Sequence, residues 1–123
     1  MDTFQVMQEH FLAGLEGRVQ HISTCSRKLR DGHDPSIINE LLRAFQSLAG
    51  SGSLHGFSNI TDISHIGVLT CRSLVHDATA DDLLELSGIV DALAIAACGA
   101  QVHFGIFPAY DRRAVPGASP RQA

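Results

Sequence analysis

The chain has 123 residues, of which 45% are hydrophobic and 18% charged, and its net charge is -4. This length fits one domain with a single core. The negative net charge gives no sign of a basic, nucleic-acid-binding surface, so we do not expect nucleic acid as a partner. No basic segment precedes an N-terminal apolar run, and no stretch approaches the roughly 18 uninterrupted apolar residues of a membrane-spanning helix. We therefore expect a soluble cytoplasmic protein without membrane contact.

The first helix is expected from about Asp2 to Leu29, and apolar residues recur along it at helical spacing. Asp2 is a plausible N-cap, and Gly32 is expected to stop the helix. The predicted core stripe consists of Phe4, Met7, Phe11, Leu15, Val19, Ile22 and Leu29.

The second helix opens with Asp34 and Pro35, an N-cap followed by proline at the first helical position. It is expected to end near His55 and Gly56. Its predicted core stripe consists of Ile38, Leu41, Phe45, Leu48 and Gly52.

Two more helices follow after short loops. One opens at Ser58 or Asn59 and closes near His76, and the next opens at Thr79 and closes at about Gly99. Their predicted core positions are Ile60, Ile63, Gly67 and Leu74, and then Leu83, Leu86, Val90, Leu93 and Ala97.

These elements predict an all-α fold, an antiparallel up-down four-helix bundle over residues 1–100. Residues 101–123 contain Pro108, Pro116 and Pro120 and are expected to form a flexible tail or a linker. The three cysteines, Cys25, Cys71 and Cys98, lie in apolar-periodic stretches, so we expect reduced core thiols. Nothing in the sequence indicates a cofactor.

The segment 46–60 is rich in glycine and serine although its first half lies inside the second helix. Each glycine in a helix interior costs about 1 kcal/mol relative to alanine. Close packing against another helix explains Gly52, which lies on the core stripe. Gly50 lies off that stripe, one turn after Gln46 on the same side, and leaves room for a partner to approach its neighbour.

This segment resembles the signature of histidine-phosphotransfer domains, roughly His-x-Leu-Lys-Gly-Ser-Ala-x-x-x-Gly followed by an apolar residue and a later leucine. Laid on the chain without gaps, the signature places Gln46 at the histidine and Ala49 at the lysine. The other positions are occupied by Leu48, Gly50, Ser51, Gly52, Gly56, Phe57 and Ile60. The resemblance covers about Phe4 to Gly99, and the helix number and short loops agree with it.

The departures from the signature concern its chemistry. In the family, the histidine ring nitrogen attacks the phospho-aspartate of a receiver domain. A glutamine amide nitrogen has its lone pair delocalised into the carbonyl, so Gln46 cannot accept the phosphoryl group. Ala49 also removes the lysine that would neutralise the phosphoryl group. Arg43 is the cation nearest to Gln46 on the same helix, although an ordinary solvated arginine is the simpler interpretation.

The resemblance therefore implies a degenerate, or pseudo-phosphotransfer, domain of a bacterial two-component phosphorelay. It would bind a receiver or histidine kinase domain without carrying phosphate and without enzymatic activity. The expected partner-binding residues are Arg43, Gln46, Ser47, Ala49, Gly50 and Ser53. The oligomeric state is not predicted.

Two other functions stay open. A displaced histidine could carry phosphate, with His65 as the alternative phosphoacceptor, whereas His55 is expected to point nearly opposite Gln46 and to be partly buried. A helical oligomerisation or scaffold domain would instead expose an apolar face on the first or the fourth helix. No metal is expected, because His21 and Cys25, one turn apart, supply only two ligands.

Overall fold

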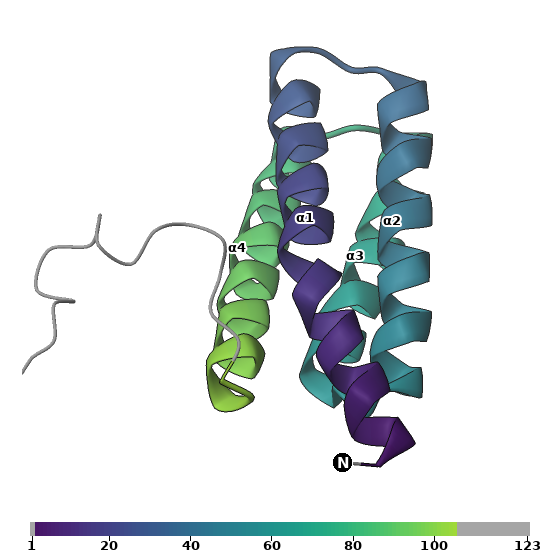
Figure 1. Cartoon of the computed structure of the whole chain (residues 1–123). Coiled ribbons are helices and arrows are strands. Elements are labelled where there is room, and N and C mark those ends of the chain that lie inside the picture. The colour runs from purple at the N-terminus through teal and green to yellow at the C-terminus, as the bar shows by residue number, and fades with distance from the viewer. Residues whose placement is uncertain (1, 106–123) are drawn as a thin grey trace, which may run out of the picture.

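The computed structural model describes residues 2–105 as an all-α bundle. Its helices are α1 (Thr3–Asp31), α2 (Pro35–Leu54), α3 (Ser58–His76) and α4 (Ala80–His103). Consecutive helices run in opposite directions and are joined by short connections, as Figure 1 shows. α1 packs against α2 and α4, and α3 packs against the same two helices. The predicted antiparallel up-down four-helix bundle is confirmed.

The predicted N-cap residues accept hydrogen bonds from the first turns of their helices. An Asp2 side-chain oxygen accepts from the backbone N–H of Gln5 at 2.7 Å, and the Gln5 side chain completes a capping box. Asp34 caps α2, and the Thr79 hydroxyl accepts from the third residue of α4. Each such cap satisfies an N–H group that the helix leaves unpaired and contributes about 1 kcal/mol.

The core follows the predicted stripes in most positions. All five predicted positions of α2 are buried, as are Ile60, Gly67 and Leu74 of α3. The prediction is wrong at the start of α1, where Phe4 is 49% and Met7 42% exposed. α1 has 29 residues and α2 only 20, and the first turns of α1 project past the end of the bundle in Figure 1. These side chains therefore have no facing helix to bury them.

Two glycines let α2 and α3 approach closely. A Cβ atom at Gly67 would lie 2.6 Å from the ring of Phe45, and one at Gly52 would lie 2.8 Å from the Thr61 hydroxyl oxygen. Both distances are shorter than side-chain packing permits. The predicted packing role of Gly52 is confirmed, and Gly67 plays the same part on α3.

The turn between α2 and α3 depends on Gly56, which has a φ of +83°. Its N–H donates to the Ser53 carbonyl, and the N–H of Phe57 donates to the Gly52 carbonyl at 2.8 Å. These bonds form a Schellman motif, in which the left-handed position favours glycine. The turn positions α3 directly beside α2.

α4 extends to His103, beyond the expected end near Gly99 and into the segment expected to be a tail. Gln101 is buried there, and its side-chain amide donates to the Leu12 carbonyl of α1 at 2.8 Å. The bundle therefore includes residues 101–103. The three prolines of the expected tail lie outside the described residues.

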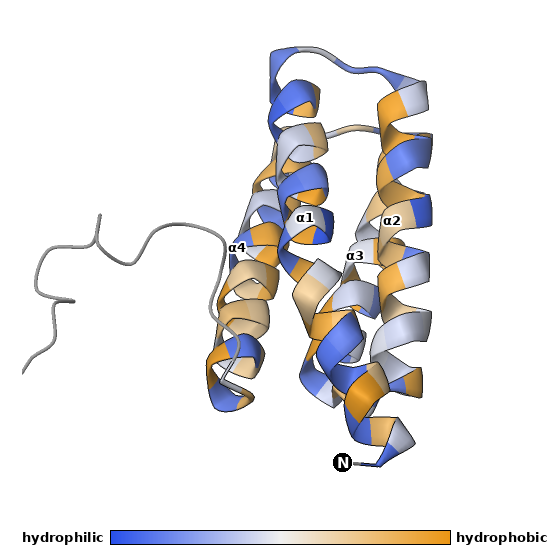
Figure 2. Ribbon diagram, viewed as in Figure 1, coloured by the Kyte–Doolittle hydropathy of each residue, from blue (hydrophilic) through white to orange (hydrophobic). Residues whose placement is uncertain are grey.

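The outer face of α4 carries apolar side chains together with the exposed Asp91, and Figure 2 shows both hydrophobic and hydrophilic residues along this helix. Leu84 and Ile95 are each 74% exposed, and Val102 is also exposed. Within residues 2–105, α4 is the one helix long and apolar enough to cross a membrane by length and composition, which alone is weak evidence for a span. Its inner face, which includes Leu86 and Leu93, packs in the bundle core.

Candidate functional site

Most of the predicted site residues line one groove between α2 and α3. The groove has a volume of about 600 Å³. It is lined by Gln46, Ala49, Gly50, Ser53, His65, Val68, Leu69 and Arg72. The structure thus brings Gln46, which aligns with the histidine of the signature, and His65, the histidine predicted as an alternative acceptor, to the same surface.

Helical spacing builds both walls of the groove. Gln46, Gly50 and Ser53 lie at intervals of four and three residues on the exposed face of α2. α3 supplies a second row with the same spacing, formed by His65, Leu69 and Arg72. The close approach of α2 and α3 at their glycines places these rows next to each other.

Gly50 leaves the approach to Gln46 open. It is exposed, and a Cβ atom placed on it would meet no atom of the described residues within 4 Å, apart from its chain neighbours and the backbone of its own helix. Gly52, two residues later, is packed against α3. Packing therefore accounts for Gly52 and leaves Gly50 without a structural role inside the bundle.

Two predicted partner-binding residues, Arg43 and Ser47, do not line the groove, and a third, Ala49, is nearly buried in it. Arg43 is exposed but does not line the groove. Ser47 faces α1, where its hydroxyl accepts a hydrogen bond from the Arg18 guanidinium at 2.9 Å. Ala49 is only 3% exposed and belongs to the groove floor, so it offers a partner little surface.

Arg72 is the cation of the groove, and sequence reasoning did not find it. It lies far from the segment 46–60 along the chain, on the neighbouring helix. The available signal was its spacing of seven residues from His65, which places the two side chains on one face of α3. Among residues 2–105, none that lines the groove is acidic, so its charge favours an anionic partner group.

His55 occupies the position that the sequence predicted for it, partly buried and away from the groove. Its Nδ1 atom lies 2.7 Å from the Ser51 carbonyl oxygen. Its ring stacks on Phe11 with the centroids 5.1 Å apart. These contacts hold the imidazole against α1, away from the groove.

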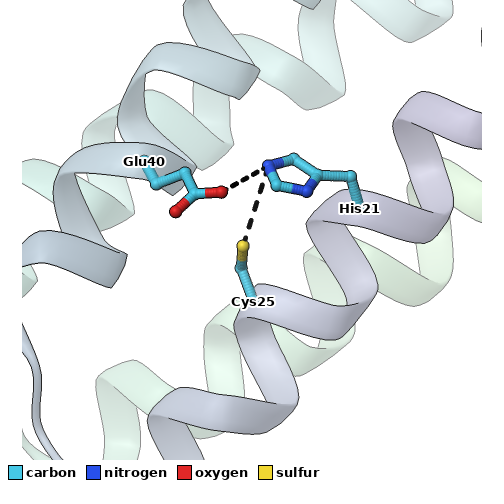
Figure 3. A group of neighbouring side chains, drawn as sticks. All are labelled: His21, Cys25 and Glu40. Carbon is cyan, nitrogen blue, oxygen red and sulfur yellow. Dashed lines mark hydrogen bonds and ion pairs between the residues drawn. The ribbon is translucent and has the colours of Figure 1, made fainter.

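A second cluster of reactive side chains lies between α1 and α2, shown in Figure 3. The His21 Nε2 atom lies 2.9 Å from a carboxylate oxygen of Glu40 and 3.8 Å from the Cys25 sulfur. Burial and the nearby Glu40 carboxylate raise the pKa of the Cys25 thiol. Sequence reasoning paired His21 with Cys25 but missed Glu40, because the register between two helices cannot be read from either helix alone.

No family model, no curated protein and no solved structure matches the chain. The resemblance to histidine-phosphotransfer domains therefore depends on the residues of the segment 46–60 and on the bundle that carries them.

Proposed function

We propose that this chain is a cytoplasmic pseudo-phosphotransfer domain of a bacterial two-component phosphorelay. It binds a receiver domain or a histidine kinase domain through the groove between α2 and α3 and carries no phosphate itself. The observation that supports this proposal most is the position of Gln46 on that groove beside the open side of Gly50.

The loss of transfer follows from the chemistry of glutamine. A phosphoryl acceptor needs a nitrogen or oxygen lone pair that can attack phosphorus. The amide nitrogen of Gln46 has no such lone pair, and its oxygen is a weak nucleophile. Ala49, in the floor below, has no charge with which to stabilise a transferred phosphoryl group.

Binding requires less than transfer does. The reacting aspartate of a receiver domain carries negative charge, which Arg72 in the groove complements. The Gln46 amide keeps a donor and an acceptor on the exposed surface. Gly50 leaves room for the loops of a partner to reach them.

A matched pair of glycine variants tests the docking surface. Gly50→Gln fills the open side of the groove, whereas Gly88→Gln adds the same side chain to α4, where a Cβ atom would also meet nothing within 4 Å. Both changes replace glycine with a better helix former, so both variants are expected to fold. Titration of a purified receiver domain by calorimetry should show weaker binding for Gly50→Gln only. Equal affinities for the two variants would contradict the proposed surface.

The groove also favours one alternative, an active phosphotransfer protein that uses His65. His65 is exposed and lines the same groove as Gln46 and Arg72. Label that passes from a phosphorylated receiver to the wild-type chain, and not to His65→Gln, would establish this alternative.

The outer face of α4 favours a second alternative, a helical oligomerisation or scaffold domain. Leu84, Ile95 and Val102 are exposed on one helix, and such a face marks an interaction site when it is contiguous. Sedimentation equilibrium distinguishes it: a dimer that Ile95→Glu converts to a monomer would support oligomerisation through α4.

A further inference from the structure

The cluster formed by His21, Cys25 and Glu40 contains three different metal-binding groups. His21 and Cys25 lie one turn apart on α1, and Glu40 reaches toward them from α2, as Figure 3 shows. Their donor atoms, an imidazole nitrogen, a sulfur and a carboxylate oxygen, all lie within 4.8 Å of one another. Three protein ligands with one open position are the usual donor set of an accessible zinc site.

The distances fit a tetrahedral zinc ion after small movements. Zinc bonds of about 2.0 Å to nitrogen or oxygen and about 2.3 Å to sulfur place tetrahedral ligands roughly 3.3 Å apart for N···O and roughly 3.6 Å apart for N···S. The corresponding distances here are 2.9 Å and 3.8 Å. For these two pairs the required shifts are a few tenths of an ångström, within reach of side-chain rotation. The Cys25 sulfur and the Glu40 carboxylate oxygen lie within 4.8 Å of each other and would have to close to roughly 3.6 Å.

The charges and the burial fit as well. A thiolate and a carboxylate together neutralise a divalent cation, and the imidazole binds in its neutral form. Cys25 is buried, whereas the side chains of His21 and Glu40 are 49% and 53% exposed. A metal ion would therefore have protein on one side and an exchangeable position toward solvent on the other. Sulfur and imidazole donors favour zinc over magnesium or calcium.

We propose that His21, Cys25 and Glu40 bind one zinc ion, with a water molecule as the fourth ligand. The ion joins α1 to α2, in place of the direct contact between His21 and Glu40. On binding, the Cys25 thiol releases its proton to solvent as the zinc–sulfur bond forms. Because the ion binds the folded chain, it stabilises the bundle. This site is separate from the groove between α2 and α3 and does not depend on the proposed function.

Zinc and cobalt titrations of the reduced full chain test the site. We expect one Zn²⁺ per chain in competition with a chromophoric chelator, and a thiolate-to-metal charge-transfer band with Co²⁺. Zn²⁺ should also raise the melting temperature. Cys25→Ala, His21→Gln and Glu40→Gln should each lower Zn²⁺ affinity by at least about tenfold. Changing a residue that only orients a metal ligand already costs about that much, and these three residues bind the ion directly.

Matched controls change the same residue types outside the cluster. Cys98→Ala, His10→Gln and Glu9→Gln should leave the affinity unchanged, because none of these residues belongs to the cluster. Glu40 is exposed, so Glu40→Gln should fold even if the change at buried Cys25 impairs folding. Absence of the cobalt–thiolate band, or an unchanged Zn²⁺ affinity in Glu40→Gln, would overturn the proposal.

Discussion

Gln46 on α2 and His65 on α3 line the same groove, with Arg72 beside them. The position that the family signature assigns to the phosphoacceptor and the histidine that could replace it therefore belong to one surface. A partner that docks on this groove meets both side chains. Partner binding without phosphate transfer and phosphate transfer through His65 would therefore use the same surface and differ only in their chemistry.

The contact between Gly67 and Phe45 should be intolerant of a larger side chain. A Cβ atom at Gly67 would lie 2.6 Å from the Phe45 ring, which is itself fully buried. We expect Gly67→Ala to lower the free energy of unfolding by about 1–3 kcal/mol through overpacking. Urea denaturation followed by circular dichroism measures the change.

Gly88→Ala is the control for this prediction. It lies in the interior of α4 with open space around it, so alanine should raise the free energy of unfolding by up to about 1 kcal/mol. A stability for Gly67→Ala equal to or above that of the wild type would show that α2 and α3 do not pack this closely.

Gly56→Ala should destabilise the turn between α2 and α3. The φ of +83° lies in the left-handed region, where a residue with a Cβ atom is strained by about 1–2 kcal/mol. Gly56→Asn should cost less, because asparagine tolerates that region better. Thermal unfolding of both variants checks the order, and an alanine variant as stable as the asparagine variant would contradict the turn geometry.

Stability should fall at alkaline pH because of Cys71. Burial raises the pKa of this thiol from 9.0 to about 12. The Cys71 thiol of the folded state loses its proton at a higher pH than that of the unfolded state. The contribution of Cys71 to the free energy of unfolding is therefore fully present below pH 9 and is lost as the pH rises toward 12. A shift of this size corresponds to a loss of up to about 4 kcal/mol.

Cys71→Ala isolates that contribution. The variant loses some packing at all pH values, but its stability should fall less steeply over the same alkaline range. Urea midpoints measured for both proteins between neutral and alkaline pH make the comparison. Parallel curves would mean that the Cys71 thiol does not stay protonated in the folded state.

The sequence predicted the elements well because local signals determine them. Asp2 and Asp34 cap their helices, and the buried stripe of α2 repeats at helical spacing. The errors at Phe4 and Met7 have a tertiary cause, since periodicity shows which face a residue occupies but not whether another helix covers it. The end of α4 was missed because Gln101 is polar and is buried through a hydrogen bond to α1.

The candidate sites were predictable only in part. Gln46, Gly50 and Ser53 lie on one helix, and their shared face follows from their spacing. Arg72 reaches the groove from α3, and Glu40 reaches the cluster on α1 from α2. Their places therefore depend on how neighbouring helices are rotated and aligned relative to each other. The hydrogen bond from Arg18 to Ser47 likewise joins two helices, so the sequence of α2 alone did not show it.

Phosphoryl transfer from a receiver domain tests the central claim most directly. A receiver labelled with radioactive acetyl phosphate is incubated with the wild-type chain, with Gln46→His, and with Gln46→His combined with Ala49→Lys. The lysine stem can run along the groove floor and carry its charge to the opening. We predict no label on the wild-type chain, label on Gln46→His, and more on the double variant. Stable label on the wild-type chain would contradict the account.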